Sequence, residues 1–116
     1  MKIKSSKFKK LSMLYPNQVS ELIDYVSMQY DDPNSLQIYF ETIPGADKAN
    51  LQFWLDSKLR TEGPPTDDDL IEEIGLSGII KPIIIDTNRD YTVEGRHRLT
   101  AAIEYAIDCP VFIISE

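Results

Sequence analysis

The sequence predicts an α+β protein, a single domain built from a small mixed β-sheet with helices packed on it. Apolar residues recur at helical spacing in four segments, and short runs between them alternate or are continuously apolar, as strands do. The last third of the chain follows the order strand, turn, strand, helix, strand. With 116 residues, 42% of them hydrophobic, the chain is long enough for one buried core and too short for two.

Four elements are expected before residue 61. They are an edge strand at 8–14, a helix at 18–30, a strand at 35–42 and a helix at 47–60. Asn17 is a favoured N-cap for the first helix, and the Asp-Asp-Pro sequence beginning at Asp31 ends it. The 35–42 segment alternates apolar and polar residues, which favours a strand, although a short helix would also fit.

The 47–60 helix carries its large apolar side chains on one stripe, which includes Trp54. A tryptophan can be a stacking platform for a base, but on an apolar helix face it more often packs in the core. We therefore expect Trp54 in the core.

A short helix is expected at about 66–74. Thr66 and Asp69 form a capping-box-like start, and Gly75 is expected to end the helix. The aspartates at 67–69 look like a metal cluster, yet acids in a first helical turn are favoured by the helix dipole, and consecutive residues point different ways. We expect no metal site there.

Three consecutive isoleucines at 83–85 are typical of a strand buried on both faces. Turn-forming residues at 87–90 lead to a returning strand at 91–93, and a closing strand is expected at 111–114. The helix between the last two strands has an apolar face made of Leu99, Ala102, Ile103 and Ala106. Its polar start must then lie at the edge of the sheet.

The start of this helix is the strongest candidate for a functional site. Gly95 allows a ligand to approach the backbone closely, and the free N–H groups of the first turn favour an anion. Arg98 supplies a bidentate grip on phosphate, and Arg96 a second cation. His97 can donate to phosphate or act as a general acid or base, and Glu94 is the nearest candidate base or magnesium ligand.

An alternative interpretation assigns these side chains to structure. Arg96 and Arg98 would then pair with Glu94, Asp90 or the acidic middle of the chain, while His97 would only pack. Charge pairing alone allows both interpretations, whereas the whole motif favours the anion site.

The net charge of -7 is distributed unevenly along the chain. Residues 1–10 form a basic arm with five lysines and no acid, whereas residues 11–80 contain three basic and thirteen acidic residues. The acidic segment would repel a phosphate backbone and offers a surface for a basic protein partner. Nucleic-acid binding would depend on the arm and the two arginines, and is not the favoured interpretation.

Composition disfavours several other classes. No apolar run approaches membrane-spanning length, and the lysine-rich start lacks the apolar stretch of a signal peptide, so we expect a cytoplasmic protein without a membrane partner. The single cysteine, Cys109, excludes an internal disulfide, and with one histidine it cannot form a cysteine/histidine zinc site.

The order of elements and motifs over 66–115 resembles the ParB/sulfiredoxin superfamily. Residues 78–83 read Gly-Ile-Ile-Lys-Pro-Ile, where ParB proteins usually read Gly-Val-Ile-Gln-Pro-Ile. In ParB proteins this motif contributes to the pocket for the cytosine nucleotide. The resemblance thus adds Gly78, Lys81 and Pro82 to the candidate binding residues, with Lys81 in the glutamine position.

The second ParB motif, Gly-Glu-Arg-Arg-x-Arg-Ala, holds the triphosphate. Gly95, Arg98 and Ala101 match it, whereas Arg96 replaces the acidic residue and His97 the first arginine. Sulfiredoxin reads Gly-Cys-His-Arg, so Arg96 stands where its reactive cysteine should be. These departures speak against sulfinic acid reduction and against partition-type CTP clamping.

What the resemblance implies is a nucleotide- or phosphate-binding domain that uses a nucleoside triphosphate with magnesium, with phosphotransfer or nuclease activity as its catalytic form. One ParB/sulfiredoxin-like domain would cover 1–116. Residues 66–115 would be its motif-bearing core, and residues 16–60 a helical insertion that carries partner or substrate specificity.

Two other hypotheses remain open. The chain could be a non-catalytic acidic module of the immunity or inhibitor type, on a vestigial ParB-like fold, whose 11–80 surface covers a basic partner. It could instead be a DNA-binding accessory that uses the basic arm, although the acidic middle disfavours this.

Overall fold

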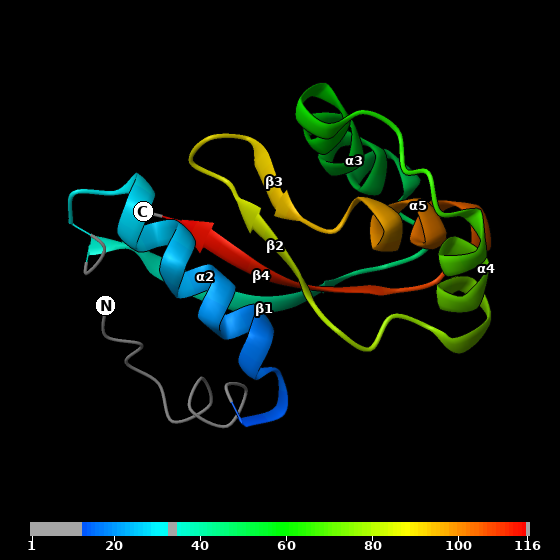
Figure 1. Cartoon of the computed structure of the whole chain (residues 1–116), viewed down its shortest axis with the longest axis horizontal. Helices are drawn as coiled ribbons and strands as arrows, with labels where there is room; N and C mark the ends of the chain where they lie inside the picture. Colours follow the sequence, from blue (N-terminus) through cyan, green and yellow to red (C-terminus); the bar gives the residue numbers. More distant parts are fainter. Residues whose placement is uncertain (1–12, 33–34, 116) are drawn as a thin grey trace.

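The computed structural model describes residues 13–32 and 35–115 and confirms the α+β class (Figure 1). Its elements are α2 (Pro16–Gln29), β1 (Gln37–Ile43), α3 (Lys48–Glu62), α4 (Asp68–Ser77), β2 (Ile83–Asp86), β3 (Tyr91–Glu94), α5 (Arg96–Tyr105) and β4 (Cys109–Ser115). The basic arm expected at 1–10 lies outside the described residues. Within the described part of the chain, no helix has both the length and the apolar character needed to cross a lipid bilayer.

The four strands form one mixed sheet in the order β1-β4-β2-β3. β1 pairs antiparallel with β4, β4 pairs parallel with β2, and β2 pairs antiparallel with β3. The parallel pair is joined through β3 and α5, because parallel neighbours need a long crossover connection. Strands β1 and β3 are therefore the edges of the sheet.

Helices cover both faces of the sheet. On one face α2 packs against Ile84, Phe112 and Ile114. On the opposite face α3 and α5 pack against Ile83 and Ile85. Because successive side chains of a strand point to opposite faces, every residue of β2 is buried. The prediction of a strand buried on both faces is confirmed.

Two helix starts differ from the prediction. α2 begins at Pro16 instead of after an Asn17 cap, because the fixed φ of proline suits the first helical position, where its missing N–H has no intrahelical partner to lose. α4 is capped by Asp67 instead of Thr66, and the Asp67 carboxylate accepts a hydrogen bond from the Leu70 amide at 3.0 Å.

The prediction that Gly75 ends α4 is wrong. The helix continues to Ser77 and is followed by Gly78, which has a φ of 86°. Gly75 serves packing instead, because a Cβ built there would lie 2.3 Å from the Tyr105 ring. Gly78, a predicted pocket residue, thus has a backbone reason for being glycine.

The first two predicted strands have different outcomes. Met13 and Leu14 are helical, so the end of the strand expected at 8–14 is wrong, and residues 8–12 lie outside the described residues. The strand expected at 35–42 is confirmed as β1 over the helical alternative.

The 16–60 segment contributes to every layer of the fold. It supplies α2 on one face of the sheet, α3 on the other and strand β1 at an edge. Trp54 on α3 is partly buried against the core, and its ring N–H donates to the Asn50 side chain at 2.9 Å. This packing confirms the core interpretation of Trp54.

Candidate functional site

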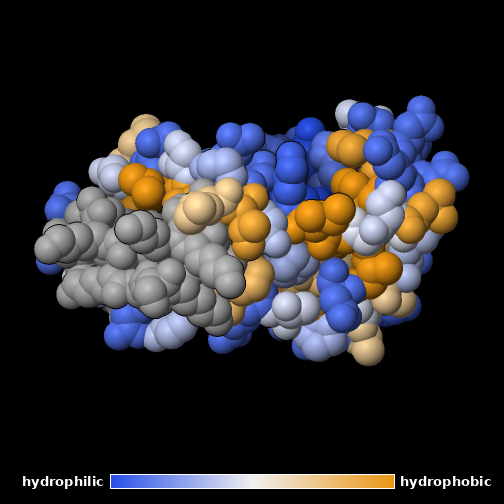
Figure 2. Space-filling model, turned by 90° about the horizontal axis from the view of Figure 1, so that it is seen from below, coloured by the Kyte–Doolittle hydropathy of each residue, from blue (hydrophilic) through white to orange (hydrophobic). Residues whose placement is uncertain are grey.

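A cavity of about 710 Å³ is lined by α2, the C-terminal part of α3, α4, β3 and the start of α5. It brings together all the predicted site residues except Pro82: Gly78, Lys81, Glu94, Gly95, Arg96, His97 and Arg98. The apolar part of the lining consists of Leu70, Ile74, Ile79 and Ile80. Of these, Ile80 is 71% exposed. Figure 2 shows one face of the molecule, where apolar residues are interspersed among polar ones.

The start of α5 has no side-chain cap. Its first internal hydrogen bond joins Leu99 N to Gly95 O at 2.9 Å, so the preceding three N–H groups lack an acceptor within the helix. α3 and α4 meet the same need with Asp47 and Asp67. Because the first turn of α5 contains no acidic residue, its own side chains leave the positive helix end uncompensated. Such a terminus favours an anion.

Gly95 is required by the fold itself. Its φ of 132° is one that L side chains rarely adopt. A Cβ built there would lie 2.4 Å from Cγ2 of Ile83, so the start of α5 packs closely on β2. Close approach to a ligand, the reason inferred from the sequence, is therefore not needed to explain this glycine.

The Arg98 guanidinium is engaged on several sides. Nη1 donates to the carbonyl oxygens of Lys81 and Pro82 at 2.9 and 2.8 Å, and Nη2 lies 3.0 Å from Glu94 Oε1. The side chain is 15% exposed. Arg98 therefore joins the loop after α4 to the start of α5. Pro82 does not line the cavity, but its carbonyl oxygen is one of the acceptors that hold Arg98.

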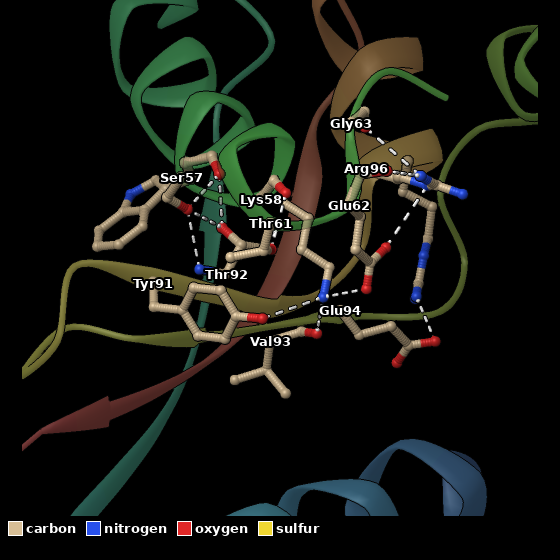
Figure 3. Close-up of polar contacts among 12 residues, drawn as sticks. Ser57, Lys58, Thr61, Glu62, Gly63, Tyr91, Thr92, Val93, Glu94 and Arg96 are labelled. Atoms are coloured by element: carbon tan, nitrogen blue, oxygen red, sulfur yellow. Dashed lines mark hydrogen bonds and ion pairs between the residues drawn. The ribbon is translucent and has the colours of Figure 1, made fainter. Parts of the chain in front are cut away.

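Arg96 holds the C-terminal end of α3. Nη1 donates to the carbonyl oxygens of Glu62 and Gly63 at 3.0 and 3.4 Å, and Nε lies 3.6 Å from the Glu62 carboxylate (Figure 3). A cation is favoured at a helix C-terminus because the helix dipole is negative there. The interpretation that both arginines form ion pairs is thus confirmed, with Glu94 for Arg98 and the acidic segment for Arg96.

Lys58 of α3 is a cavity residue that sequence reasoning missed. It is 5% exposed, and its ammonium lies 2.5 Å from Val93 O, 2.7 Å from Glu62 Oε1 and 3.4 Å from the Tyr91 hydroxyl (Figure 3). A signal was present, since Lys58 follows Leu51 by seven residues and so lies on the buried stripe. The lysine chain crosses from α3 to the backbone of β3.

Glu21 of α2 is the second missed residue, and it pairs with Glu94 across the cavity. A hydrogen bond to Glu94, burial and the Glu94 charge raise the pKa of Glu21 to about 7, against the opposing charges of Arg98 and Lys58. Glu21 therefore keeps its proton up to near-neutral pH. Local sequence carries no signal for a pair so far apart in the chain.

Two buried side-chain atoms of the described residues lack a hydrogen-bond partner among amide, hydroxyl and cationic groups. They are Oε2 of Glu94 and Nε2 of His97. Both residues line the cavity. Buried polar atoms in native proteins normally have partners, so these two mark places where a ligand can bind.

The charged groups that line the cavity are balanced in number. The basic residues are Lys58, Lys81, Arg96 and Arg98, and the acidic residues are Glu21, Glu62, Glu73 and Glu94. Within the described ranges, no three or more His, Cys, Asp or Glu side chains are grouped to hold a metal ion.

A separate buried carboxylate fixes α2 to the sheet. Asp86, at the end of β2, is fully buried and accepts hydrogen bonds from the hydroxyls of Tyr25 and Tyr30 at 2.9 and 2.5 Å. It also accepts the Asn88 amide at 3.0 Å. Burial and the hydrogen bond to Asp86 raise the pKa of Tyr25 above its ordinary value. This network holds the wall that carries Glu21.

Comparison of the chain with models of known protein families, with curated proteins and with solved structures finds no match. What the cavity can bind follows from its own groups: an uncapped helix start, a histidine nitrogen and a carboxyl pair.

Proposed function

We propose that this chain binds a phosphorylated small molecule of nucleotide size, with a phosphate group at the start of α5. The observation that carries the proposal is the construction of that helix start, which has three N–H groups without an acceptor in the helix and a basic first turn of Arg96, His97 and Arg98. Basic side chains at a helix N-terminus oppose the dipole, so an anion would relieve an unfavourable arrangement.

His97 has a ring nitrogen that could bond to a phosphate oxygen, whereas the two arginines are already bonded to protein groups. Its unpartnered Nε2 is buried in the cavity lining, whereas Arg96 and Arg98 already bond to carbonyl and carboxylate groups. A protonated imidazole would donate to a phosphate oxygen in a charge-assisted hydrogen bond. The cavity volume falls within the range of sites for molecules of nucleotide size.

The ParB/sulfiredoxin-like resemblance supports the same ligand class and extends the proposal. A nucleoside triphosphate with magnesium would use Gly78 and Lys81 at the loop end of the cavity, with Glu94 as one carboxylate ligand or base. Phosphotransfer or nuclease activity is the catalytic form of the proposal. Glu94 and His97 are then the groups that move protons.

Titration calorimetry with ATP, ADP, CTP and GTP, each with and without magnesium, tests the proposal. We expect saturable binding of at least one nucleotide and a loss of about tenfold in affinity in His97→Ala, as for one charge-assisted hydrogen bond. Arg60→Ala, an exposed residue outside this cavity, is the matched control. Arg98→Ala is a poor probe, because it also frees the Lys81–Pro82 loop. Absence of binding, or equal affinity in His97→Ala, would overturn the proposal.

A second candidate function is favoured by the surface of α4. Asp68, Asp69, Glu72 and Glu73 are exposed there, and none takes part in an ion pair with another described residue. This surface suits a non-catalytic acidic module of the immunity or inhibitor type. That function predicts no nucleotide affinity and salt-sensitive binding of a cationic protein. Fluorescence anisotropy with labelled polylysine, comparing the wild type with Asp69→Lys/Glu72→Lys, two exposed residues outside the cavity lining, separates the two functions.

A further inference from the structure

We propose that the Glu21–Glu94 pair is a second recognition site in the same cavity, which binds a protonated amine carried by the phosphorylated ligand. The inference rests on the proposed function and adds the class of ligand, a phosphate ester that also bears a primary amine. One end of the ligand would meet the start of α5, and the other would meet the two carboxyls.

The geometry of Glu94 shows where the amine would bind. Oε1 of Glu94 is already bonded to Arg98 at 3.0 Å, whereas Oε2 is buried and no amide, hydroxyl or cationic group of the described residues donates to it. An ionised carboxylate oxygen only accepts hydrogen bonds, and leaving it without a donor is costly. Glu21 lines the same cavity, and its contact with Glu94 helps to raise the Glu21 pKa.

An ammonium group can supply the donor that Glu94 Oε2 lacks. It carries one positive charge and three donors, so it can bond to both carboxylates once Glu21 has lost its proton. The carboxyls come from different walls, Glu21 from α2 and Glu94 from β3, and both line the cavity. A ligand amine would therefore replace a contact between two like groups with one between opposite charges.

The other charged groups around the pair do not compete for this role. Arg98 of α5 and Lys58 of α3 act on Glu21 only at a distance, and each has partners of its own. On α2 itself, the neighbouring cavity residue is the neutral Gln18. A purely anionic ligand would add unbalanced negative charge to a cavity with equal numbers of basic and acidic residues, whereas a dipolar ligand would not.

The test compares phosphoethanolamine with ethyl phosphate, which lacks the amine, by titration calorimetry at pH 6. We expect the amine compound to bind about tenfold more tightly, as for a hydrogen-bonded charge. Repeating both titrations in buffers of different ionisation enthalpy counts protons. With ethyl phosphate as the baseline, phosphoethanolamine should release about one further proton, the one that Glu21 keeps in the free protein.

Variants make the result specific to the pair. Glu21→Gln should abolish the extra proton release and the preference for the amine while ethyl phosphate still binds, and Glu94→Gln is the second variant if the first does not fold. Equal affinity for both compounds, or a preference that survives in Glu21→Gln, would overturn the amine site and leave the phosphate site standing. If neither compound binds, the phosphate site fails and the amine site fails with it.

Discussion

Lys58 Nζ lies 2.5 Å from the carbonyl oxygen of Val93, so a buried lysine donates to the backbone of edge strand β3. Beside it, the Ser57 hydroxyl accepts the Thr92 amide at 2.9 Å (Figure 3). Exposed backbone groups on an edge strand are a template for pairing with another chain. Here, Lys58 and Ser57 of α3 bond to two backbone groups of β3. Lys58 and Val93 also line the cavity.

Replacing Lys58 with methionine should lower the free energy of unfolding by about 1–3 kcal/mol, because Val93 O loses its donor and Glu62 its nearest cation. Urea unfolding followed by circular dichroism measures the change. Lys48→Met, at the exposed start of the same helix, should stay within about 0.5 kcal/mol of the wild type. Equal effects of the two substitutions would show that the contact to β3 contributes nothing.

Gly95→Ala should destabilise the protein by more than Gly63→Ala. Both residues have positive φ, at 132° and 74°, and therefore share a backbone cost of about 1–3 kcal/mol. Only at Gly95 would the new methyl group meet the Ile83 side chain, at 2.4 Å, whereas the space at Gly63 is open. Urea unfolding of both variants checks the order, and a larger loss for Gly63→Ala would contradict it.

Asp86→Asn should cost about 1–3 kcal/mol, because asparagine has one accepting oxygen, whereas Oδ2 of Asp86 accepts from both tyrosine hydroxyls and Oδ1 accepts from the Asn88 backbone N–H. The substitution should also bring the pKa of Tyr25 back toward its ordinary value, since the hydrogen bond to Asp86 helps to raise it. Absorbance titration of the tyrosines reads this second effect. Asp90→Asn is the control, because Asp90 is exposed and asparagine tolerates its φ of 48°. An unchanged tyrosine titration in Asp86→Asn would contradict the role of this network.

Glu21 should make stability fall as pH rises from about 4.5 to about 7. Its pKa is raised from 4.5 to about 7 in the folded protein, so in this interval the unfolded chain releases a proton that the native state keeps. Glu21→Gln should remove this contribution, with thermal stability close to the wild type at pH 4 and higher at pH 8. Thermal unfolding at several pH values measures it, with Asp24→Asn on the same helix as the control. A variant less stable than the wild type at pH 8 would be evidence against the carboxyl pair.

Elements whose signal is local were predictable. The isoleucines at 83–85 predicted a strand buried on both faces, because covering both faces of a strand requires an uninterrupted apolar run. The motif at 94–98 is contiguous, and its residues all line the cavity; of the three residues that the resemblance added, Gly78 and Lys81 line it and Pro82 does not. The exact helix boundaries were less predictable, because Gly75 reads as a helix end but makes room for the Tyr105 ring.

The ion pair between Arg98 and Glu94 was among the alternatives read from the sequence, but the carbonyl partners of the two arginines were not. Arg96 donates to a carbonyl group at the end of α3, and Arg98 donates to carbonyl groups of the Lys81–Pro82 loop. The residues next to each arginine in the sequence do not indicate these acceptors. Glu21 is one of thirteen acidic residues between 11 and 80 and differs from them only through its contact with Glu94.

By itself, the sequence determined the class of the fold and which residues stand together at the start of α5. Helical and strand spacing decide which segments bury an apolar face, and the residues of the α5 start are contiguous, so they meet in any fold that forms this helix. Only the tertiary structure decided which of these groups are free to bind. When α2, α3 and α5 pack around one sheet, the two arginines bond to carbonyl and carboxylate groups of the protein. The Glu21–Glu94 pair and His97 Nε2 then remain as the groups available to a ligand. The physical reason is that hydrogen bonds and desolvation act through distance in space, which the order of residues in the chain does not specify.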